Sequence, residues 1–150
     1  MQKKTSNAQR RTLDLEFRGG RVAETSNGDY GRRPKYDLEE RLLEFTAEIV
    51  RLADALPNTK AGNHIVGQLL RCGTSPLANH GEVEAAESRR DFLHKLRICL
   101  KELRETWRWL RLIGRLQFAQ PAELRSSLTE VEELIRIFAA SVRTTEKNAK

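Results

Sequence analysis

The chain has little of what loops, disulfide frameworks and membrane spans require. Its 150 residues include only nine glycines and four prolines, so few positions interrupt regular structure. The two cysteines, Cys72 and Cys99, form no CxxC pair, and we expect them to be small buried hydrophobic residues. There is no run of about 18 apolar residues to span a bilayer, and the N-terminal residues lack the apolar core of a signal peptide. We therefore expect a soluble, cytoplasmic protein.

The residues that are abundant favour helix. The chain is 39% hydrophobic and 32% charged, and it is rich in Leu, Ala, Glu and Arg, whereas runs typical of strands are few. A chain of this length can bury one hydrophobic core without the help of disulfides or metals. These features predict a single all-α domain.

Apolar residues recur at the three- and four-residue spacing of one helix face in four consecutive runs. The first begins at Asp37, a suitable N-cap, and ends before Pro57; the others begin near Lys60, Ser88 and Pro121. The third run ends at a glycine and has a heptad-like seam made of Leu93, Leu96, Leu100, Leu103, Trp107 and Leu110. Four such helices with short connections predict an antiparallel up-down four-helix bundle over residues 36–146, followed by a C-terminal tail over 147–150.

Residues 1–35 show no apolar period and hold nine Lys/Arg against four Asp/Glu, a net charge of +5. Ordering them would cost more conformational entropy than their burial returns, so we expect a flexible basic tail. Its one alternating segment, Leu13 to Phe17, could bind a partner in an extended form.

The stretch from Gly73 to Asn79 contains a proline inside the second helical run. Proline removes an amide donor and disfavours helical angles in the residue before it. We therefore expect a kink or a restart near Pro76, with Gly73 as the stop and Ser75 as the new N-cap. Asn79 would then bond a backbone group at the kink or a neighbouring helix.

The same region and the start of the third run contain two weak candidates for chemistry. A nucleophilic Ser75 would need a base in reach, but His80 lies about 140° away around a helix. Asp91 and His94 have the acid-x-x-His spacing of di-iron bundles, which need that motif twice together with further Glu ligands. The motif occurs once, so we expect no enzyme, no metal centre and no cofactor.

The third run also contains a row of regularly spaced basic residues. The row, here called the basic stripe, steps by three and four residues and therefore lies along one side of a helix. Glu105 could form ion pairs with two of its members, and Glu102 lies on the same helix, but two carboxylates cannot neutralise the charge of six cations. The basic stripe consists of Arg97, Lys101, Arg104, Arg108, Arg111 and Arg115.

Two partners could balance this excess charge. Phosphate oxygens of RNA or DNA would satisfy the stripe, with the +5 tail assisting. Alternatively, the stripe could pair within or between subunits with the acidic residues of the first run, which are Glu39, Glu40, Glu44, Glu48 and Asp54. The first reading predicts a nucleic-acid-binding or adaptor protein, and the second a protein-interaction scaffold. Of the two tryptophans, we expect Trp107 in the core and Trp109 at a subunit interface.

The segment LLRCGTSPLANHGEVEAAESRRDFLHKLRICLKELRETWRWLRLI, Leu69 to Ile113, resembles a family of four-helix-bundle proteins encoded in intervening sequences of bacterial 23S ribosomal RNA genes. The similarity extends from about Tyr36 to Phe138 and is densest at Thr74–Asn79 and Asp91–Ile113. A related branch is the accessory variability determinant of diversity-generating retroelements. The resemblance implies a non-enzymatic bundle that assembles into a homopentamer with a basic surface and, in the retroelement branch, partners a reverse transcriptase and nucleic acid.

Overall fold

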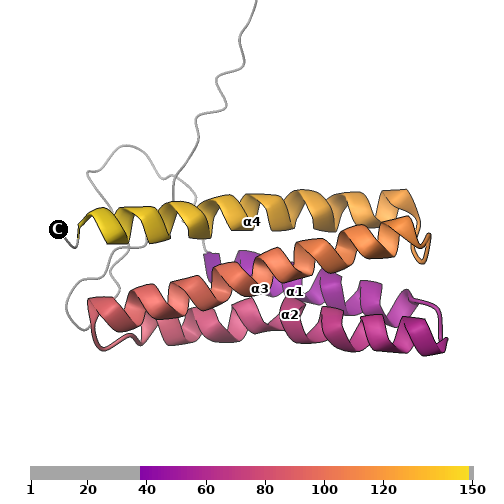
Figure 1. Cartoon of the computed structure of the whole chain (residues 1–150), viewed down its shortest axis with the longest axis horizontal. Helices are drawn as coiled ribbons and strands as arrows, with labels where there is room; N and C mark the ends of the chain where they lie inside the picture. The colour runs from indigo at the N-terminus through magenta and orange to yellow at the C-terminus, as the bar shows by residue number, and fades with distance from the viewer. Residues whose placement is uncertain (1–37, 149–150) are drawn as a thin grey trace, which may run out of the picture.

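The computed structural model describes residues 38–148 and consists there of four helices (Figure 1). Residues 1–37 lie outside the described part, as do the predicted tail over 1–35 and the predicted N-cap at Asp37. The all-α fold and the starts predicted near Lys60, Ser88 and Pro121 are confirmed. The helices are α1 (Leu38–Ala55), α2 (Lys60–Glu84), α3 (Arg89–Arg115) and α4 (Pro121–Lys147).

The four helices surround one hydrophobic core. Each of α1 and α3 packs against both α2 and α4, so α1 and α3 occupy opposite corners of the bundle. In Figure 1 the α1–α2 and α3–α4 loops lie at one end of the molecule and the α2–α3 loop lies at the other. The side chains that fill the core come from all four helices and include Phe45, Leu69, Phe92, Leu103 and Phe138. No helix in the described part is long and apolar enough to cross a membrane.

Helix α2 passes through Pro76 without a break. The predicted restart, with a stop at Gly73 and an N-cap at Ser75, is therefore wrong, while a bend at Pro76 stays a prediction. Gly73 is instead explained by packing, because a Cβ atom there would lie 2.6 Å from Cγ2 of Ile49 in α1. The glycine permits the close approach of α1 to α2, and Pro76 is buried at the same level of the bundle.

The loops on either side of α3 are defined by local hydrogen bonds. At its start, Ser88 is the N-cap, and its hydroxyl accepts a bond from the Asp91 amide at 3.1 Å. At its end, the helix continues one residue past the predicted stop at Gly114. The left-handed position is taken by Gln117, with φ of 56°, and the next amide, that of Phe118, donates to the Ile113 carbonyl at 3.1 Å. This is the Schellman arrangement, here built on a glutamine where glycine is the usual residue.

Candidate nucleic-acid interface

All six residues of the basic stripe are exposed on α3. They lie away from the buried side of the helix, to which the fully buried Thr106 belongs. Arg104 and Arg108 lie two residues before and after Thr106, so each is rotated from it by about 160–200°. The stripe therefore follows the outermost edge of α3, and Leu93 and Trp107 of the predicted seam are only partly buried.

Two members of the stripe have carboxylate partners. Nη2 of Arg97 lies 2.6 Å from Oε1 of Glu146 in α4, and Nζ of Lys101 lies 3.9 Å from Oε1 of Glu102. Both pairs are largely exposed on the basic side, with 74% of the Lys101 side chain accessible, so each contributes little to stability. Among the residues that the structure describes, no carboxylate lies within salt-bridge distance of the other four members, which are Arg104, Arg108, Arg111 and Arg115.

The carboxylate predicted to relieve the stripe is engaged elsewhere. Glu105 pairs with Arg71 of α2, and Oε2 of the buried Glu102 lies 3.4 Å from the same guanidinium group. Sequence spacing on α3 alone could not reveal this competitor, because Arg71 comes from another helix. Since Glu105 lies on the α2 side of α3, the outer edge keeps its positive charge.

The acidic residues of α1 do not neutralise the stripe within the chain. Helices α1 and α3 lie diagonally across the bundle and no ion pair between described residues joins them, while the one α1–α4 ion pair there joins Arg41 to Glu130, with Nη2 to Oε2 at 2.9 Å. Pairing between α1 acids and the stripe therefore requires a second subunit. The hypothesis that the basic stripe pairs with the acidic residues of α1 within one subunit is therefore wrong for the described part of the chain.

Trp107 connects the stripe to α4. Its indole Nε1 donates a hydrogen bond to Oε1 of Glu132 at 3.2 Å, and the guanidinium carbon of Arg111 lies 4.4 Å from the ring centroid. This cation–π contact holds the Arg111 guanidinium group over the ring without neutralising its charge. Trp109 faces the other way and packs edge-on against His64 of α2, with centroids 6.2 Å apart.

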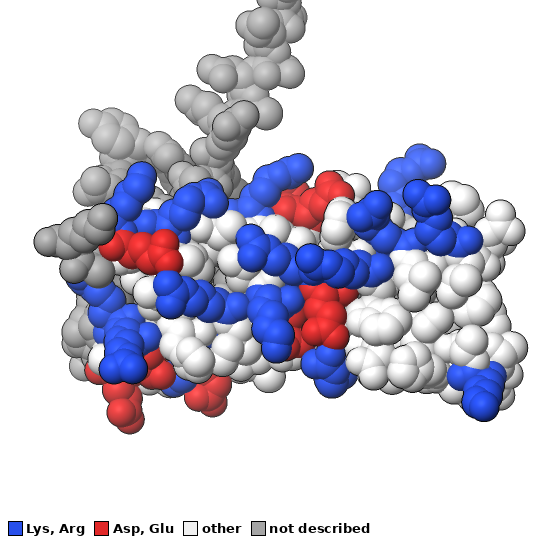
Figure 2. Space-filling view, in the orientation of Figure 1, with Lys and Arg blue, Asp and Glu red and all other residues white. Residues whose placement is uncertain are grey.

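Helix α4 extends the basic surface beyond the predicted stripe. Arg125, Arg136 and Arg143 are spaced by eleven and seven residues and therefore share one side of α4. That side also carries Glu146, which pairs with Arg97 of α3, and Glu132, which accepts a hydrogen bond from Trp107 of α3 and lies 4.0 Å from Arg136. Arg136 also pairs with Glu133, so its charge is partly balanced within α4. Figure 2 shows Lys and Arg side chains gathered in a broad band over α3 and α4, with smaller acidic patches between them. The spacing of the α4 arginines was the signal in the sequence that would have found them.

The residues predicted to form the kink make local hydrogen bonds. Nδ2 of Asn79 donates to the Ser75 carbonyl at 2.9 Å and to the Ser75 hydroxyl at 2.8 Å, which confirms that Asn79 bonds a backbone group beside Pro76. His80, the base considered for a nucleophilic serine, is buried edge-on against Phe138, with centroids 6.5 Å apart. The structure therefore does not bring Ser75 and His80 together as a catalytic pair.

The single acid-x-x-His motif is used for an ion pair. Oδ2 of Asp91 lies 2.9 Å from Nζ of Lys95, and the hydrogen bond from this ammonium lowers the pKa of the Asp91 carboxyl. The same bond raises the pKa of Lys95. Within residues 38–148, no three His, Cys, Asp or Glu side chains are grouped so that they could hold a metal ion.

The two cysteines are buried, as predicted. Burial raises the pKa of Cys72 to about 11 and that of Cys99 to about 12. Because the neutral thiol is favoured at these positions, neither cysteine has the thiolate character that reactive cysteines need.

Comparison with known proteins agrees with this architecture. A model of the 23S rRNA-intervening sequence protein family matches residues 35–140. A crystal structure of a protein of unknown function from Bacteroides thetaiotaomicron, assigned to the S23 ribosomal protein family, is 35% identical. It covers 71% of this chain and 98% of its own, with a TM-score of 0.66. No curated protein matches the chain. The family match spans more than half of the chain, and the chain therefore belongs to the 23S rRNA-intervening sequence protein family.

Proposed function

We propose that this protein is a non-enzymatic nucleic-acid-binding or adaptor protein of the cytoplasm, and that the basic stripe with the neighbouring arginines of α4 is its binding surface. The observation that carries the proposal is that Arg104, Arg108, Arg111 and Arg115 are exposed without a carboxylate partner among the described residues. A row of like charges is unfavourable by itself, and an external polyanion would relieve it.

The shape of the surface favours contacts to the phosphate backbone. The stripe runs along about 27 Å of a straight helix whose outer edge is convex, and its residues are mainly arginines, which bind phosphate oxygens through two parallel hydrogen bonds. Such contacts fix the position of a nucleic acid but do not read its sequence. Binding would therefore be strong at low salt and weakly sequence-specific.

The same chain carries a surface suited to self-association. Leu43 and Val50 of α1 are spaced by seven residues and are 48% and 38% exposed on the side away from the core. We infer that this side contributes to a homo-oligomer, in which several basic stripes would act together on one nucleic acid. A pentameric ring and a reverse transcriptase partner, both implied by the earlier resemblance, stay predictions.

The alternative function, a protein-interaction scaffold, would require charge pairing between subunits. Glu39, Glu44 and Asp54 are exposed on α1 and form no ion pair with α3 among the described residues of their own subunit. They could pair with the basic stripe of a neighbouring subunit, in which case the stripe would serve assembly. The two functions differ in what happens when the stripe is removed: loss of nucleic-acid affinity in one case and loss of the oligomer in the other.

The proposal is tested by fluorescence-anisotropy titration of a structured RNA and a DNA duplex at several salt concentrations. The Arg104→Ala/Arg108→Ala variant should bind duplex DNA roughly 10- to 60-fold more weakly at 0.1 M salt, because two phosphate contacts and their released counterions are lost. The slope of log K against log salt should become shallower by about 2.

The matched control is Arg51→Ala/Lys60→Ala, which removes the same charge from exposed positions on α1 and α2. This control should lower the affinity by much less than the stripe variant. Equal affinities and equal salt slopes for the two variants would show that the stripe has no special role. Dissociation of the oligomer by the stripe variant alone, seen by light scattering, would favour the scaffold function.

A further inference from the structure

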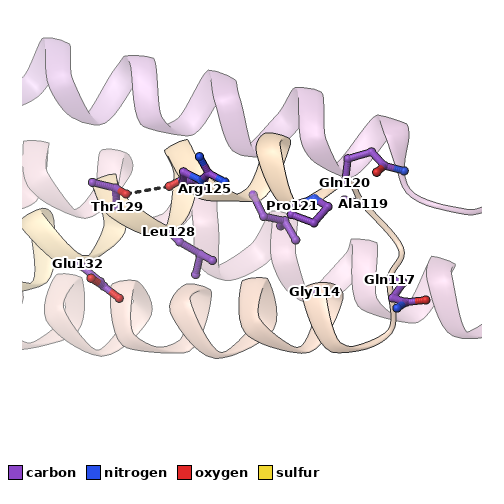
Figure 3. A pocket seen from close by; sticks show the side chains of 10 residues that line it. Gly114, Gln117, Ala119, Gln120, Pro121, Arg125, Leu128, Thr129 and Glu132 are labelled. Atoms are coloured by element: carbon purple, nitrogen blue, oxygen red, sulfur yellow. Dashed lines mark hydrogen bonds between the residues drawn. The ribbon is translucent and has the colours of Figure 1, made fainter.

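An open groove lies at the end of the basic stripe, between the last turn of α3 and the first half of α4. Its volume is about 740 Å³, and the loop over residues 116–120 closes one end (Figure 3). In Figure 3 Gly114 lies on the α3 side, while Leu128 projects from α4 toward α3. Gly114 allows this part of α4 to come close, since a Cβ atom there would lie 3.3 Å from Cδ1 of Leu124.

The lining combines apolar surface with hydrogen-bonding groups. Leu124, Leu128 and Pro121 provide the apolar part, while Arg125 and Glu132 provide charges of opposite sign. The hydroxyl of Thr129, which also lines the groove, donates to the Arg125 carbonyl at 2.8 Å within α4. Figure 3 shows the side chains of Thr129 and Glu132 along the part of the groove remote from the loop.

The groove is continuous with the stripe. Gly114, which lines it, lies between Arg111 and Arg115 in the sequence. Glu132, at its far side, accepts the hydrogen bond from Trp107, and Arg111 covers the Trp107 ring at 4.4 Å. Arg125 therefore lines the groove directly, and Arg111 is connected to its far side through Trp107.

The amino end of α4 is not an anion site in itself. The Glu123 carboxylate accepts a hydrogen bond from the Gln120 amide at 3.0 Å, and so already places a negative charge at this end of the helix. An isolated phosphate would be repelled there. A ligand with a flat apolar body, polar edges and a phosphate directed toward the arginines fits the lining better.

We propose that this groove receives one unpaired nucleobase of a nucleic acid whose backbone follows the basic stripe. The apolar side chains would cover a face of the base, Glu132 would accept hydrogen bonds from its polar edge, and Arg125 would contact the adjoining phosphate. This inference rests on the proposed nucleic-acid binding and adds a preference for RNA or DNA with an unpaired base over a fully paired duplex.

The test uses two RNA hairpins of equal nucleotide number, one with a fully paired stem and one with a single unpaired adenosine. The full-length wild-type protein should bind the second about tenfold more tightly in fluorescence anisotropy, because one base buries a face against the apolar side chains of Leu124 and Leu128. Thr129→Trp should abolish this preference by filling the groove, while affinity for the paired hairpin and its salt slope should stay unchanged. Thr129 is exposed and bonds only within its own helix, so the variant should fold.

The matched control is Ser126→Trp, at a position of α4 that is also exposed but does not line the groove, and it should keep the tenfold preference. Equal binding of both hairpins by the wild-type protein, or identical behaviour of the two Trp variants, would overturn the inference and leave the stripe proposal intact. Failure of the wild-type protein to bind either hairpin would overturn both. If Thr129→Trp kept the preference but blocked binding of a labelled Leu13–Phe17 peptide, the groove would be a peptide site and the inference would be wrong.

Discussion

Helices α1 and α3 stand at opposite corners of the same bundle and differ in length and charge. Helix α1 has 18 residues, and its segment over residues 36–56 carries two basic and six acidic side chains. Helix α3 has 27 residues and carries nine basic and three acidic ones. The outward side of α1 mixes carboxylates with exposed Leu43 and Val50, whereas the outer edge of α3 is a row of cations.

The difference shows how a nearly neutral bundle can hold two surfaces of opposite sign. Charge balance over residues 36–150, eighteen basic against seventeen acidic, says nothing about where each charge lies. Helices α1 and α3 lie diagonally across the bundle and no ion pair between described residues joins them, so their charges do not cancel by direct pairing in one chain. In the proposed function, the edge of α3 would bind an external polyanion and the edge of α1 would contribute to self-association.

The largest expected effect is a loss of stability, and it should differ between a substitution on the buried side of α3 and one on the outward side of α1. Leu110→Ala, at a fully buried position of α3, should lower the free energy of unfolding by about 3 kcal/mol, since it removes apolar contacts and leaves a cavity. Leu43→Ala, at a position of α1 that is 48% exposed, should change it by less than about 0.5 kcal/mol in a monomer. Urea denaturation at low protein concentration measures both. A large loss for Leu43→Ala that grows with protein concentration would place this residue inside an oligomer interface.

The next effect concerns how closely α1 is held to the rest of the bundle. Gly73→Ala should destabilise the protein by about 1–3 kcal/mol, because the new Cβ would lie 2.6 Å from Ile49 Cγ2 and push α1 away from α2. Gly67→Ala, on the same helix with no atom within 4 Å of the added Cβ, should stabilise it by about 0.5–1 kcal/mol through helix propensity. Thermal unfolding followed by circular dichroism compares the pair. Similar shifts for both variants would mean that α1 can move without cost.

The smallest effect concerns the end of α3. Gln117→Gly should stabilise the protein by about 0.5–1 kcal/mol, since glycine adopts a φ of 56° without the steric cost borne by glutamine. Gln117→Ala is the control and should be nearly neutral, because alanine meets the same backbone cost. Chemical denaturation of the three proteins tests this. A gain for the alanine variant equal to that of the glycine variant would assign the effect to the side chain and not to the backbone.

The starts of α2, α3 and α4 and the assignment of the apolar faces were predictable because they depend on local spacing and capping. The exposure of all six stripe residues was also predictable, since alternate three- and four-residue steps keep them on one side. The depth to which α3 is buried could not be predicted, because Thr106 is a polar residue that is nevertheless fully buried. Its hydroxyl donates a hydrogen bond to the Glu102 carbonyl at 2.9 Å. This hydrogen bond within α3 removes the free-energy cost of burying an unpaired hydroxyl group.

The site was harder to predict wherever a partner came from another helix. The capture of Glu105 by Arg71, the bond between Trp107 and Glu132, and the groove beside Gly114 all depend on which helices are neighbours and on their relative height. The spacing of apolar residues predicts which face of a helix is buried, but it does not predict which helices are neighbours or how far one is shifted along another. The continuity of α2 through Pro76 has the same origin, because tertiary packing of a buried proline outweighed the local preference for a stop.

Pro76 has a consequence for what holds the two parts of α2 in place. Its ring nitrogen carries no proton, so the carbonyl of Cys72 receives no amide bond from the next turn, and the nine residues from Pro76 to Glu84 begin without that link to the first sixteen. A helical segment of nine residues does not hold its shape in water on its own. The carboxyl-terminal third of α2 should therefore depend more on its packing against α3 than the first sixteen residues do.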